Sequence, residues 1–391
     1  MNSFLHRSWV EIDLDNIEHN VKEIRTLIGN DVELMACVKA DAYGHGSGVV
    51  SLLLERVGVD SFGVSNINEA EVLRKAGIKK PILILGFTPP ELVGLLTRLD
   101  ITQTILSLEY AKALSEEAKR IGATIKSCIK VDTGMSRIGF LADDINTAAN
   151  QIEQACNLPG IRAEGIFTHF AVADELTPFG KQYTENQHAK FAQLMSRLSQ
   201  QGLRFKSVHC CNSAATLFYS EMHHTLVRVG IMIYGLPPSE SVSHKINLKP
   251  AMALKSAISQ VKELQNDTSI SYGCRYITDG IRQVATLPLG YADGYPRCLG
   301  DKARAYIHGT LVPIVGTICM DQLMIDVTGL DVKQDDEVTM FGGDSPIGLQ
   351  NLAGLAGTIC YELCCGISRR IPRVYIKDKK ILDAIDYSML V

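Results

Sequence analysis

The stretch from Glu33 to Ser65, ELMACVKADAYGHGSGVVSLLLERVGVDSFGVS, contains one strand–helix–strand unit and indicates the fold of the chain. The apolar run Glu33–Lys39 predicts a buried strand, and Gly48–Val57 has the spacing of a helix. A second short apolar run, residues 61–65, follows. Strands that alternate with single helices in this way are typical of a parallel sheet.

The same alternation continues from residue 12 to about residue 235. A helix is expected over Asp13–Gly29, with Asp15 as its cap and Gly29 at its end. Further helices are expected over Glu109–Ile121 and Gln182–Gln201, and further strands at residues 81–85, 102–106, 125–131, 163–168, 206–209 and 226–229. Eight strand–helix units in about 230 residues indicate a (β/α)8 barrel, whereas an open doubly wound sheet rarely needs so many. We therefore expect a TIM-type α/β barrel domain over residues 12–238.

The pattern changes after Gly235. Pro237, Pro238 and Ser239 predict a linker. Beyond it, Gly, Asp and Pro turns separate β-rich runs at Ala253–Val261, Gln283–Leu289, Ala303–His308, Val312–Val315, Gln322–Val327 and Glu337–Phe341. Only Leu349–Cys365 has helical spacing. We expect a mostly β domain over residues 239–391, with which an N-terminal strand, residues 1–11, packs.

The composition is that of a globular protein, with 46% hydrophobic and 21% charged residues among 391. Lysine and arginine number 39 against 43 aspartate and glutamate, so the net charge of −4 offers no basic field for nucleic acid or anionic lipid. No apolar stretch is long enough to cross a bilayer, and no secretory signal is expected. The composition thus favours a small-molecule site and argues against nucleic-acid or membrane partners.

The 11 cysteines are odd in number and irregularly spaced, and many lie in apolar runs, where a thiol packs as a small hydrophobe. We therefore expect reduced thiols and a cytoplasmic protein. Cys360, Cys364 and Cys365 have the one spacing that resembles a metal site, but no second Cys or His pair accompanies them. No metal is expected on this ground.

The functional groups of a barrel lie where its strands end at their carboxyl side. Cationic and imidazole side chains follow the expected strands there: Lys39, Lys130, Arg137, His169 and Arg228. Asn212, Ser213 and Gly230, after the last two strands, offer small side chains and backbone N–H groups of the kind that bind phosphate. A single lysine at a strand end is more often merely exposed, and a single histidine there is more often structural. Together these residues favour a phosphorylated cofactor held covalently by Lys39, pyridoxal 5'-phosphate.

The motif VKADAYGHG, Val38–Gly46, resembles the cofactor-lysine signature of bacterial alanine racemases, which are fold-type III pyridoxal-phosphate enzymes. The resemblance covers nearly the whole chain in order, through KVDTGMSRIG (Lys130–Gly139), THFAVAD (Thr168–Asp174), Asn212–Ala214, VRVGIMIYG (Val227–Gly235), Ser271–Gly273, PLGYADGYP (Pro288–Pro296), GTICMDQ (Gly316–Gln322) and Tyr361–Glu362. Val229 stands where the family often has proline, and Ser136 where it usually has glycine. Neither position is a proposed reacting group.

The resemblance implies a two-base racemase that interconverts L-alanine and D-alanine. Lys39 would form the aldimine with the cofactor and act as the base on the D-face. Tyr272, from the partner subunit of a homodimer, would be the base on the L-face, because one group cannot serve both sides of the ring. His169 and Arg228 would relay the proton of Tyr272. Arg228 would also donate to the pyridine nitrogen, and because an arginine stays protonated, the ring would remain a weaker electron sink, which suits a racemase.

The other positions of the family's site also have counterparts in this sequence. The cofactor would be contacted by Lys39, Tyr43, His169, Asn212, Ser213, Arg228, Gly230, Ile231 and Tyr361. Arg137 and the backbone of Met320 would bind the substrate carboxylate, and Tyr291 would narrow the entrance. Lys130 matches a lysine that is carbamylated in many relatives. The role implied is the supply of D-alanine for peptidoglycan.

Three other functions remain open. A pyridoxal-phosphate carrier protein built on a barrel alone would have no dedicated substrate, but the roughly 150-residue β domain with Tyr272 argues against it. A decarboxylase of the same cofactor class would use an acidic partner at the pyridine nitrogen, where Arg228 stands. The third is a racemase for serine or for a wider range of amino acids, which an assay with L-alanine, L-serine and L-lysine would separate.

Overall fold

The computed structural model describes residues 7–239 and 245–387, which fall into two compact units. The barrel unit comprises Glu18–Ala42 and Ser47–Leu248. The C-terminal unit comprises the chain up to Ile17, the short segment Tyr43–Gly46 and the chain from Lys249 onward. The loop that follows Lys39 therefore leaves the barrel unit for four residues and then returns to it.

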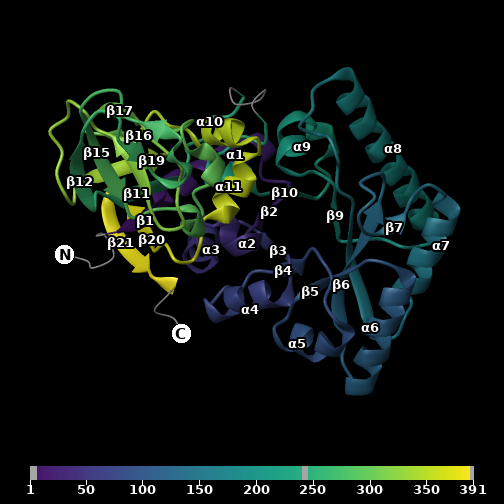
Figure 1. Cartoon of the computed structure of the whole chain (residues 1–391). Helices are drawn as coiled ribbons and strands as arrows, with labels where there is room; N and C mark the ends of the chain where they lie inside the picture. The colour runs from purple at the N-terminus through teal and green to yellow at the C-terminus, as the bar shows by residue number, and fades with distance from the viewer. Residues whose placement is uncertain (1–6, 240–244, 388–391) are drawn as a thin grey trace. The chain divides into compact units, whose positions relative to one another are not determined.

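Eight parallel strands form the sheet of the barrel unit, in the order β10-β2-β3-β4-β5-β6-β8-β9 (Figure 1). Their bounds are β2 (Glu33–Cys37), β3 (Ser61–Val64), β4 (Ile82–Ile84), β5 (Thr102–Ile105), β6 (Ile125–Asp132), β8 (Ile161–Phe167), β9 (Ser207–His209) and β10 (Leu226–Val229), and the short β7 (Phe140–Leu141) pairs with β6. Backbone hydrogen bonds from Thr225 to Val208 (3.2 Å) and from Arg228 to Cys211 (3.0 Å) join the two outer strands and nearly close the barrel. The predicted (β/α)8 barrel is confirmed.

Helices cover the outside of this sheet, and Figure 1 shows α4 to α8 around β3 to β9. The helices are α1 (Leu14–Ile28), α3 (Ser47–Arg56), α4 (Ile67–Lys75), α5 (Val93–Arg98), α6 (Leu108–Ile121), α7 (Ile145–Cys156), α8 (Pro178–Gln200) and α9 (Ser213–Phe218), with 3₁₀ turns η2 (Pro90–Leu92), η3 (Ser220–Met222) and η4 (Ile231–Tyr234). The Ser107 hydroxyl accepts from the N–H of Tyr110 and starts α6, and Gly122, with φ of 67°, ends it. Buried Val21 and Ile24 confirm the face of α1 that the sequence pattern selects.

The segment after β2 differs from the expected strand over Glu33–Lys39, because β2 ends at Cys37. Residues Lys39–Tyr43, labelled α2, form one helical turn in which Ala40, Asp41 and Ala42 have φ of 51, 53 and 55°. The turn is therefore left-handed, a conformation that costs L-residues roughly 1–2 kcal/mol each. A hydrophobic pattern reports which residues are buried and not the sign of φ, so it cannot reveal this turn.

Two sheets and a hairpin form the C-terminal unit. The seven-stranded sheet has the order β17-β16-β19-β11-β1-β20-β21, the three-stranded sheet the order β12-β15-β18, and β13 pairs with β14. The strands are β1 (Ser8–Asp13), β11 (Met252–Ala257), β12 (Gln260–Leu264), β13 (Ser269–Ile270), β14 (Tyr276–Ile277), β15 (Arg282–Leu287), β16 (Arg304–Ile307), β17 (Thr310–Pro313), β18 (Leu323–Asp326), β19 (Glu337–Phe341), β20 (Arg373–Lys377) and β21 (Lys380–Ile385). The helical segments are η6 (Tyr272–Cys274), η7 (Tyr291–Asp293), η8 (Arg297–Leu299), α10 (Leu349–Ala356) and α11 (Cys360–Gly366).

The N-terminal strand lies inside the seven-stranded sheet. In Figure 1 the purple β1 lies between the green β11 and the yellow β20, with which it pairs antiparallel and parallel respectively. Of the strand expected at residues 1–11, residues 1–6 lie outside the described part of the chain. The two ends of the sequence thus contribute neighbouring strands to one sheet.

Two expectations for the C-terminal unit are wrong in detail. The run Ala253–Val261 is not one strand, because the chain leaves the seven-stranded sheet after Ala257 and enters the three-stranded one at Gln260. The helix expected over Leu349–Cys365 is two helices, because Gly357 adopts φ of 72° and ends the first. Apolar residues continue through the end of β11 and through the end of α10, so the hydrophobic pattern does not predict either break. β20 and β21 have no counterpart among the expected strands.

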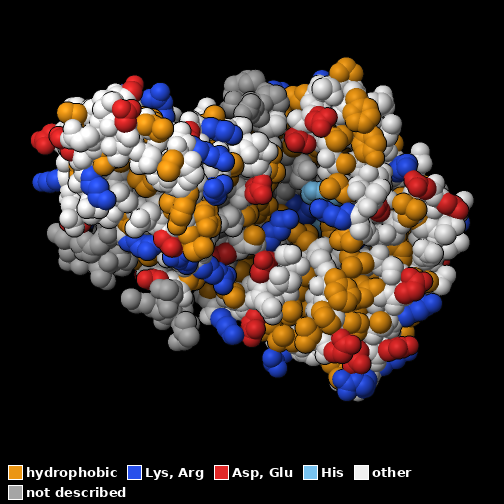
Figure 2. Space-filling view, viewed as in Figure 1, with side chains coloured by type: hydrophobic (Ala, Val, Ile, Leu, Met, Phe, Trp, Pro, Cys, Tyr) orange, Lys and Arg blue, Asp and Glu red, His pale blue; other side chains and the backbone are white. Residues whose placement is uncertain are grey.

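The exterior agrees with the composition. On the face shown in Figure 2, acidic and basic side chains are interspersed, as the net charge of −4 suggests. Within residues 7–239 and 245–387, no helix has both the length and the apolar composition needed to cross a membrane. All 11 cysteines lie in these ranges and are free thiols, so the fold depends on packing and hydrogen bonds rather than on cross-links.

Candidate active site

Arg228, on β10, is the centre of a polar network at the end of the barrel strands and is only 3% exposed. Its guanidinium donates to Nδ1 of His209 (2.7 Å), to Nδ1 of His169 (3.2 Å) and to the carbonyl oxygens of Thr168 (2.8 Å) and Cys210 (3.0 Å). These four partners fix the side chain, and none of them is a carboxylate. A buried cation held by neutral groups favours an electron-rich ligand beside it.

Both histidines of this network are neutral. Burial, and then the positive charge of Arg228, lowers the pKa of His169 and of His209 well below the usual value. A neutral imidazole that accepts a hydrogen bond at Nδ1 carries its proton on Nε2. The Nε2 of His209 lies 3.7 Å from Sγ of Cys128, and its ring stacks on Phe167 at 5.0 Å. His169 therefore presents an Nε2–H group that can pass on a proton.

Lys39 follows β2 and is half-buried at the same strand ends. Burial raises the pKa of the Cys37 thiol, and the positive charges of Lys39 and Arg228 oppose that rise. The two cations therefore lie near one thiol. Lys39 thus lies at the carboxyl ends of the strands together with Arg228.

Lys130, on β6, is buried and only 2% exposed. Its Nζ donates to the carbonyl oxygen of Val131 at 2.6 Å and lies 5.5 Å from the centre of the Phe167 ring. Burial, and then the charge of Arg228, lowers the pKa of Lys130 to about 7. A substantial fraction of this side chain is thus the neutral amine at neutral pH.

The loops after β9 and β10 are joined by a hydrogen bond from the Gly230 N–H to the Ser213 hydroxyl (3.0 Å). Asn212 caps α9 by accepting from the N–H of Ala215 (3.0 Å), and Ile231 begins η4. Both loops lead into helical turns, whose first N–H groups have no acceptor within the turn. Such N–H groups, with small side chains beside them, fit the phosphate of the predicted cofactor.

Arg137 lies in the loop between β6 and β7 and is exposed. The carboxylate of Asp132 shapes this loop by accepting from the N–H groups of Gly134 (2.9 Å) and Ser136 (3.0 Å). Ser136 has φ of 56°, in the left-handed region. The loop therefore has a defined shape and leaves the guanidinium of Arg137 accessible for an anion.

In the C-terminal unit, Tyr43 and Tyr361 lie together, with ring centroids 6.1 Å apart and planes tilted by 51°. Gly44 has φ of 80°, and a Cβ atom there would lie 2.2 Å from the carbonyl oxygen of Cys364. Only glycine fits this close approach. Arg373, 1% exposed, donates to the Gly44 carbonyl oxygen at 3.1 Å and secures the segment that carries Tyr43.

Tyr272 and Met320 line one open hollow of about 600 Å³ in the C-terminal unit. Tyr272 is 72% and Met320 53% exposed, which is unusual for large apolar side chains on one surface. The N–H of Tyr291 donates to the Cys319 carbonyl oxygen at 3.0 Å, beside Met320. Three predicted site residues thus share one surface of this unit.

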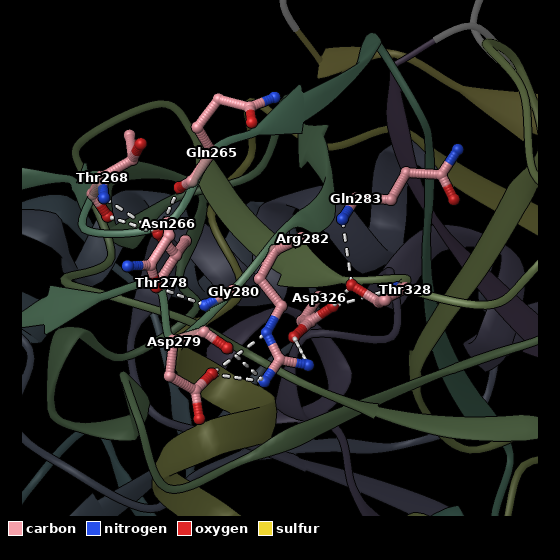
Figure 3. A network of polar contacts seen from close by, with 10 residues as sticks. All are labelled: Gln265, Asn266, Thr268, Thr278, Asp279, Gly280, Arg282, Gln283, Asp326 and Thr328. Atoms are coloured by element: carbon pink, nitrogen blue, oxygen red, sulfur yellow. Dashed lines mark hydrogen bonds and ion pairs between the residues drawn. The ribbon is translucent and has the colours of Figure 1, made fainter.

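Tyr272 lies in the turn between β13 and β14, and Figure 3 shows a polar network formed by residues that flank these two strands in sequence. The Thr278 hydroxyl donates to the Gln265 carbonyl oxygen (2.6 Å) and accepts from the Thr268 N–H (2.9 Å). The N–H of Gly280 donates to the Asn266 side chain at 2.6 Å. The other members of the network are Asp279, Arg282, Gln283, Asp326 and Thr328. Because both ends of the loop are bonded, its tip is presented from a fixed base.

The structure adds residues that the sequence did not reveal. His209 is the last residue of β9, and Gln187, on α8, is 1% exposed. The Gln187 side chain donates to the His169 carbonyl oxygen (3.2 Å) and accepts from the Ala171 N–H (2.9 Å). Both are polar side chains that the fold buries, and Arg373, on β20, is a third. No sequence signal finds His209 or Arg373, because β9 is too short to show which side faces the site and no strand is predicted at Arg373.

The predicted site residues thus form one set in each unit. The barrel unit holds Lys39, Lys130, Arg137, His169, Asn212, Ser213, Arg228, Gly230 and Ile231, and the C-terminal unit holds Tyr43, Tyr272, Tyr291, Met320 and Tyr361.

Two family models match most of the chain: "Alanine racemase, N-terminal domain" over residues 12–238 and "Alanine racemase, C-terminal domain" over residues 251–375. The chain belongs to the alanine racemase family. An alanine racemase of Desulforamulus reducens is 44% identical over 370 residues, which are 94% of this chain and 98% of that protein. The solved structure of an alanine racemase of Clostridium difficile 630 matches with a TM-score of 0.93 and 38% identity, over 97% of this chain and 98% of that one.

Alanine racemases are pyridoxal-phosphate-dependent isomerases, so both the family resemblance and the cofactor predicted from the sequence are confirmed. A histidine racemase of Leuconostoc mesenteroides also matches, with a TM-score of 0.86 and 30% identity over 95% of this chain and 99% of that one. The same fold therefore serves more than one amino-acid side chain. The residues at the site, and not the fold, therefore determine which amino acid is the substrate.

Proposed function

We propose that this protein interconverts L-alanine and D-alanine. The observation that carries the proposal is Arg228, a buried cation held by two neutral histidines and backbone carbonyls. Bound pyridoxal phosphate supplies an electron sink that makes the α-proton of an attached amino acid acidic. Arg228 would donate to the pyridine nitrogen without protonating it, which would limit that sink and disfavour transamination.

Lys39 and Tyr272 serve as the two bases of the reaction, Lys39 on the D-face and Tyr272 on the L-face. Inversion needs a group on each face, because one group cannot remove and return the proton on both. The Nε2–H of the neutral His169 donates to the hydroxyl oxygen of Tyr272, and Arg228, which donates to Nδ1, holds the imidazole in that tautomer. The exposure of Tyr272 on an anchored loop supports a homodimer in which one copy supplies Tyr272 to the Lys39 of the other.

The remaining residues bind and orient. Arg137 and the N–H of Met320 hold the substrate carboxylate, and Tyr291 narrows the entrance. The phosphate is held by Tyr43, Asn212, Ser213, Gly230, Ile231 and Tyr361. In this division residues 12–238 supply most of the cofactor contacts, and residues 239–391 with the N-terminal strand supply Tyr361 and the second base.

Lys130 is a further candidate for modification. Its pKa of about 7 leaves a neutral amine, and a neutral amine can add to carbon dioxide. A C–N bond then forms, one proton leaves to solvent, and the side chain becomes a carbamate anion. This anion would pair with Arg137, whose positive charge acts on Lys130.

The alternatives are weaker on the same geometry. A decarboxylase of this cofactor class needs an acid at the pyridine nitrogen, and the partners of Arg228 are imidazoles and carbonyls. A racemase for serine or other amino acids remains the closer alternative. The family and the free thiols support a cytoplasmic enzyme that supplies D-alanine for peptidoglycan.

Replacement of Lys39 tests the proposal. Purified protein should show the absorbance of cofactor bound to a lysine and should racemize L-alanine. Lys39→Ala should abolish both, and borohydride should then fix no cofactor to the chain. Lys126→Ala, which changes a lysine near the other end of β6, should leave both unchanged. A Lys39→Ala protein that keeps the bound chromophore, or native protein that releases carbon dioxide instead of D-alanine, would overturn the assignment.

A further inference from the structure

Three side chains with metal-binding atoms meet in the barrel unit, outside the site described above. His188 is on α8, Cys210 follows β9, and His224 lies two residues before β10. One ligand atom of each lies within 4.8 Å of the other two. Within the described ranges this is the one group of three or more His, Cys, Asp or Glu side chains with that spacing.

The spacing suits a small metal ion. Zn–N bonds of about 2.0–2.1 Å and Zn–S bonds of about 2.3 Å put the ligand atoms of a tetrahedral site roughly 3.3–3.6 Å apart. The Nε2 atoms of His188 and His224 are already 3.1 Å apart. His224 is exposed and His188 half-buried, so an ion can reach them from solvent, and the buried Cys210 completes the site from inside.

The surroundings of Cys210 allow a metal ion to replace the proton of its thiol. Its Sγ donates to the Met222 carbonyl oxygen at 3.0 Å, and Sγ of Cys211 donates to the same oxygen at 3.2 Å. When Cys210 binds a metal as the thiolate, its proton goes to solvent. The carbonyl then keeps Cys211 as its donor, so ligation leaves no buried acceptor without a partner.

The ring of His224 is held in place by its backbone and its packing. Its φ of 50° lies in the left-handed region, which is uncommon for so large a side chain. The ring packs edge-on against Phe191 at 5.9 Å and tilts toward His188 at 5.3 Å. Neither ring takes part in the racemization described above.

We propose that His188, Cys210 and His224 form a binding site for a borderline-soft divalent metal ion of the Zn²⁺ type, with water as the fourth ligand. Two imidazoles and one thiolate with an open fourth position are a ligand set that zinc takes. The ligands come from three separate segments of the chain, so sequence spacing does not reveal the site. The bound ion ties α8 to the strand ends that hold Arg228, since the Cys210 carbonyl accepts from that arginine.

Zinc binding to the full-length holoprotein, treated with chelator and dialysed, tests this site. One equivalent of Zn²⁺ per chain should bind, and its X-ray absorption spectrum should show one sulfur and two imidazole ligands. His188→Gln and His224→Gln should each weaken zinc binding by more than the roughly 10- to 100-fold that is lost when a residue hydrogen-bonded to a ligand is replaced. Zn²⁺ should also raise the thermal midpoint of the native protein and have no such effect on His224→Gln.

Cys210→Ser should remove the sulfur from the spectrum, and Cys211→Ser is its matched control. Cys211 is equally buried and bonds to the same carbonyl, but it is not among the three proposed ligands. If Cys210→Ser does not fold, the two histidine variants carry the test, because they change accessible side chains. Unchanged affinity in both histidine variants, or a spectrum without sulfur, would overturn the proposal. These readouts do not depend on racemization and so stand apart from the proposed function.

Discussion

At the scale of single residues, the barrel side of the site depends on the partners of Arg228. The sequence predicts Lys39, His169 and Arg228, because each stands at or just beyond a predicted strand end. His209 is not predicted, although it makes the shortest hydrogen bond to Arg228, at 2.7 Å. It ends β9, which has three residues. So short a strand gives too few alternations to show which side chain faces the site.

His209→Phe should lower the turnover number for alanine roughly 10-fold or more, because it leaves one buried N–H of Arg228 without an acceptor. His209→Gln, which keeps an acceptor, should recover part of the loss. Racemization rates and KM for the three proteins check this. His223→Phe is the matched control, since His223 is also a buried histidine of this unit but bonds to the Thr216 carbonyl. Equal turnover in His209→Phe and native protein contradicts the positioning role.

Tyr361 should favour alanine over serine. Its ring lies 6.1 Å from that of Tyr43. We expect it to crowd the space for a substrate side chain larger than a methyl group. An apolar pocket rejects an added hydroxyl by only about 100-fold or less, so some serine activity should remain. Tyr361→Asn should open space, supply a polar partner and raise kcat/KM for serine relative to alanine. An unchanged ratio in the variant, or equal efficiencies in the native protein, contradicts this assignment.

At the scale of elements, the sequence places strands and helices well but not the reversals of the backbone. The α6 helix begins one residue before its predicted range, because side chains set its cap and its 3.6-residue period. The α8 helix begins at Pro178, four residues before the predicted Gln182, because the prediction misses its Thr177 cap. The left-handed turn at Lys39–Tyr43 and the break at Gly357 depend on backbone angles. A change of partner strand, as between β11 and β12, depends on contacts distant in sequence. Tertiary structure determines these features, so a local hydrophobic pattern does not predict them.

Ser136→Gly should stabilise the loop between β6 and β7. Ser136 has φ of 56°, where the family usually has glycine. Relief of a left-handed cost of roughly 1–2 kcal/mol, less roughly 0.5–1 kcal/mol of glycine entropy, leaves a gain between zero and about 1.5 kcal/mol. Urea or thermal unfolding measures it. Ala189→Gly, at an exposed position within α8, should instead lose about 1 kcal/mol. A destabilised Ser136→Gly protein would show that the serine side chain does more for the loop than its backbone strain costs.

At the scale of the whole molecule, the count of strand–helix units predicts the barrel, and the change of texture after Gly235 predicts a second domain. The path of the chain between them is harder to foresee. The segment Tyr43–Gly46 belongs to the C-terminal unit although it follows Lys39 directly, and glycine at position 44 is required there by Cys364. The assignment of Tyr43–Gly46 to the C-terminal unit depends on the close approach of backbone atoms from residues hundreds of positions apart in the sequence. Only the finished fold shows it.

The last prediction concerns assembly. If one copy supplies Tyr272 to the Lys39 of another, Lys39→Ala and Tyr272→Phe should each be inactive alone and active after mixing and subunit exchange. Each mixed dimer then has one site with both lesions and one site with neither. Equal amounts exchanging at random give half mixed dimers, so about a quarter of the native activity should return. Exchange is followed with differently tagged copies, and a mixture of Lys39→Ala with itself, carrying the two tags, is the control. Proven exchange without recovered activity would place Tyr272 in the site of its own chain.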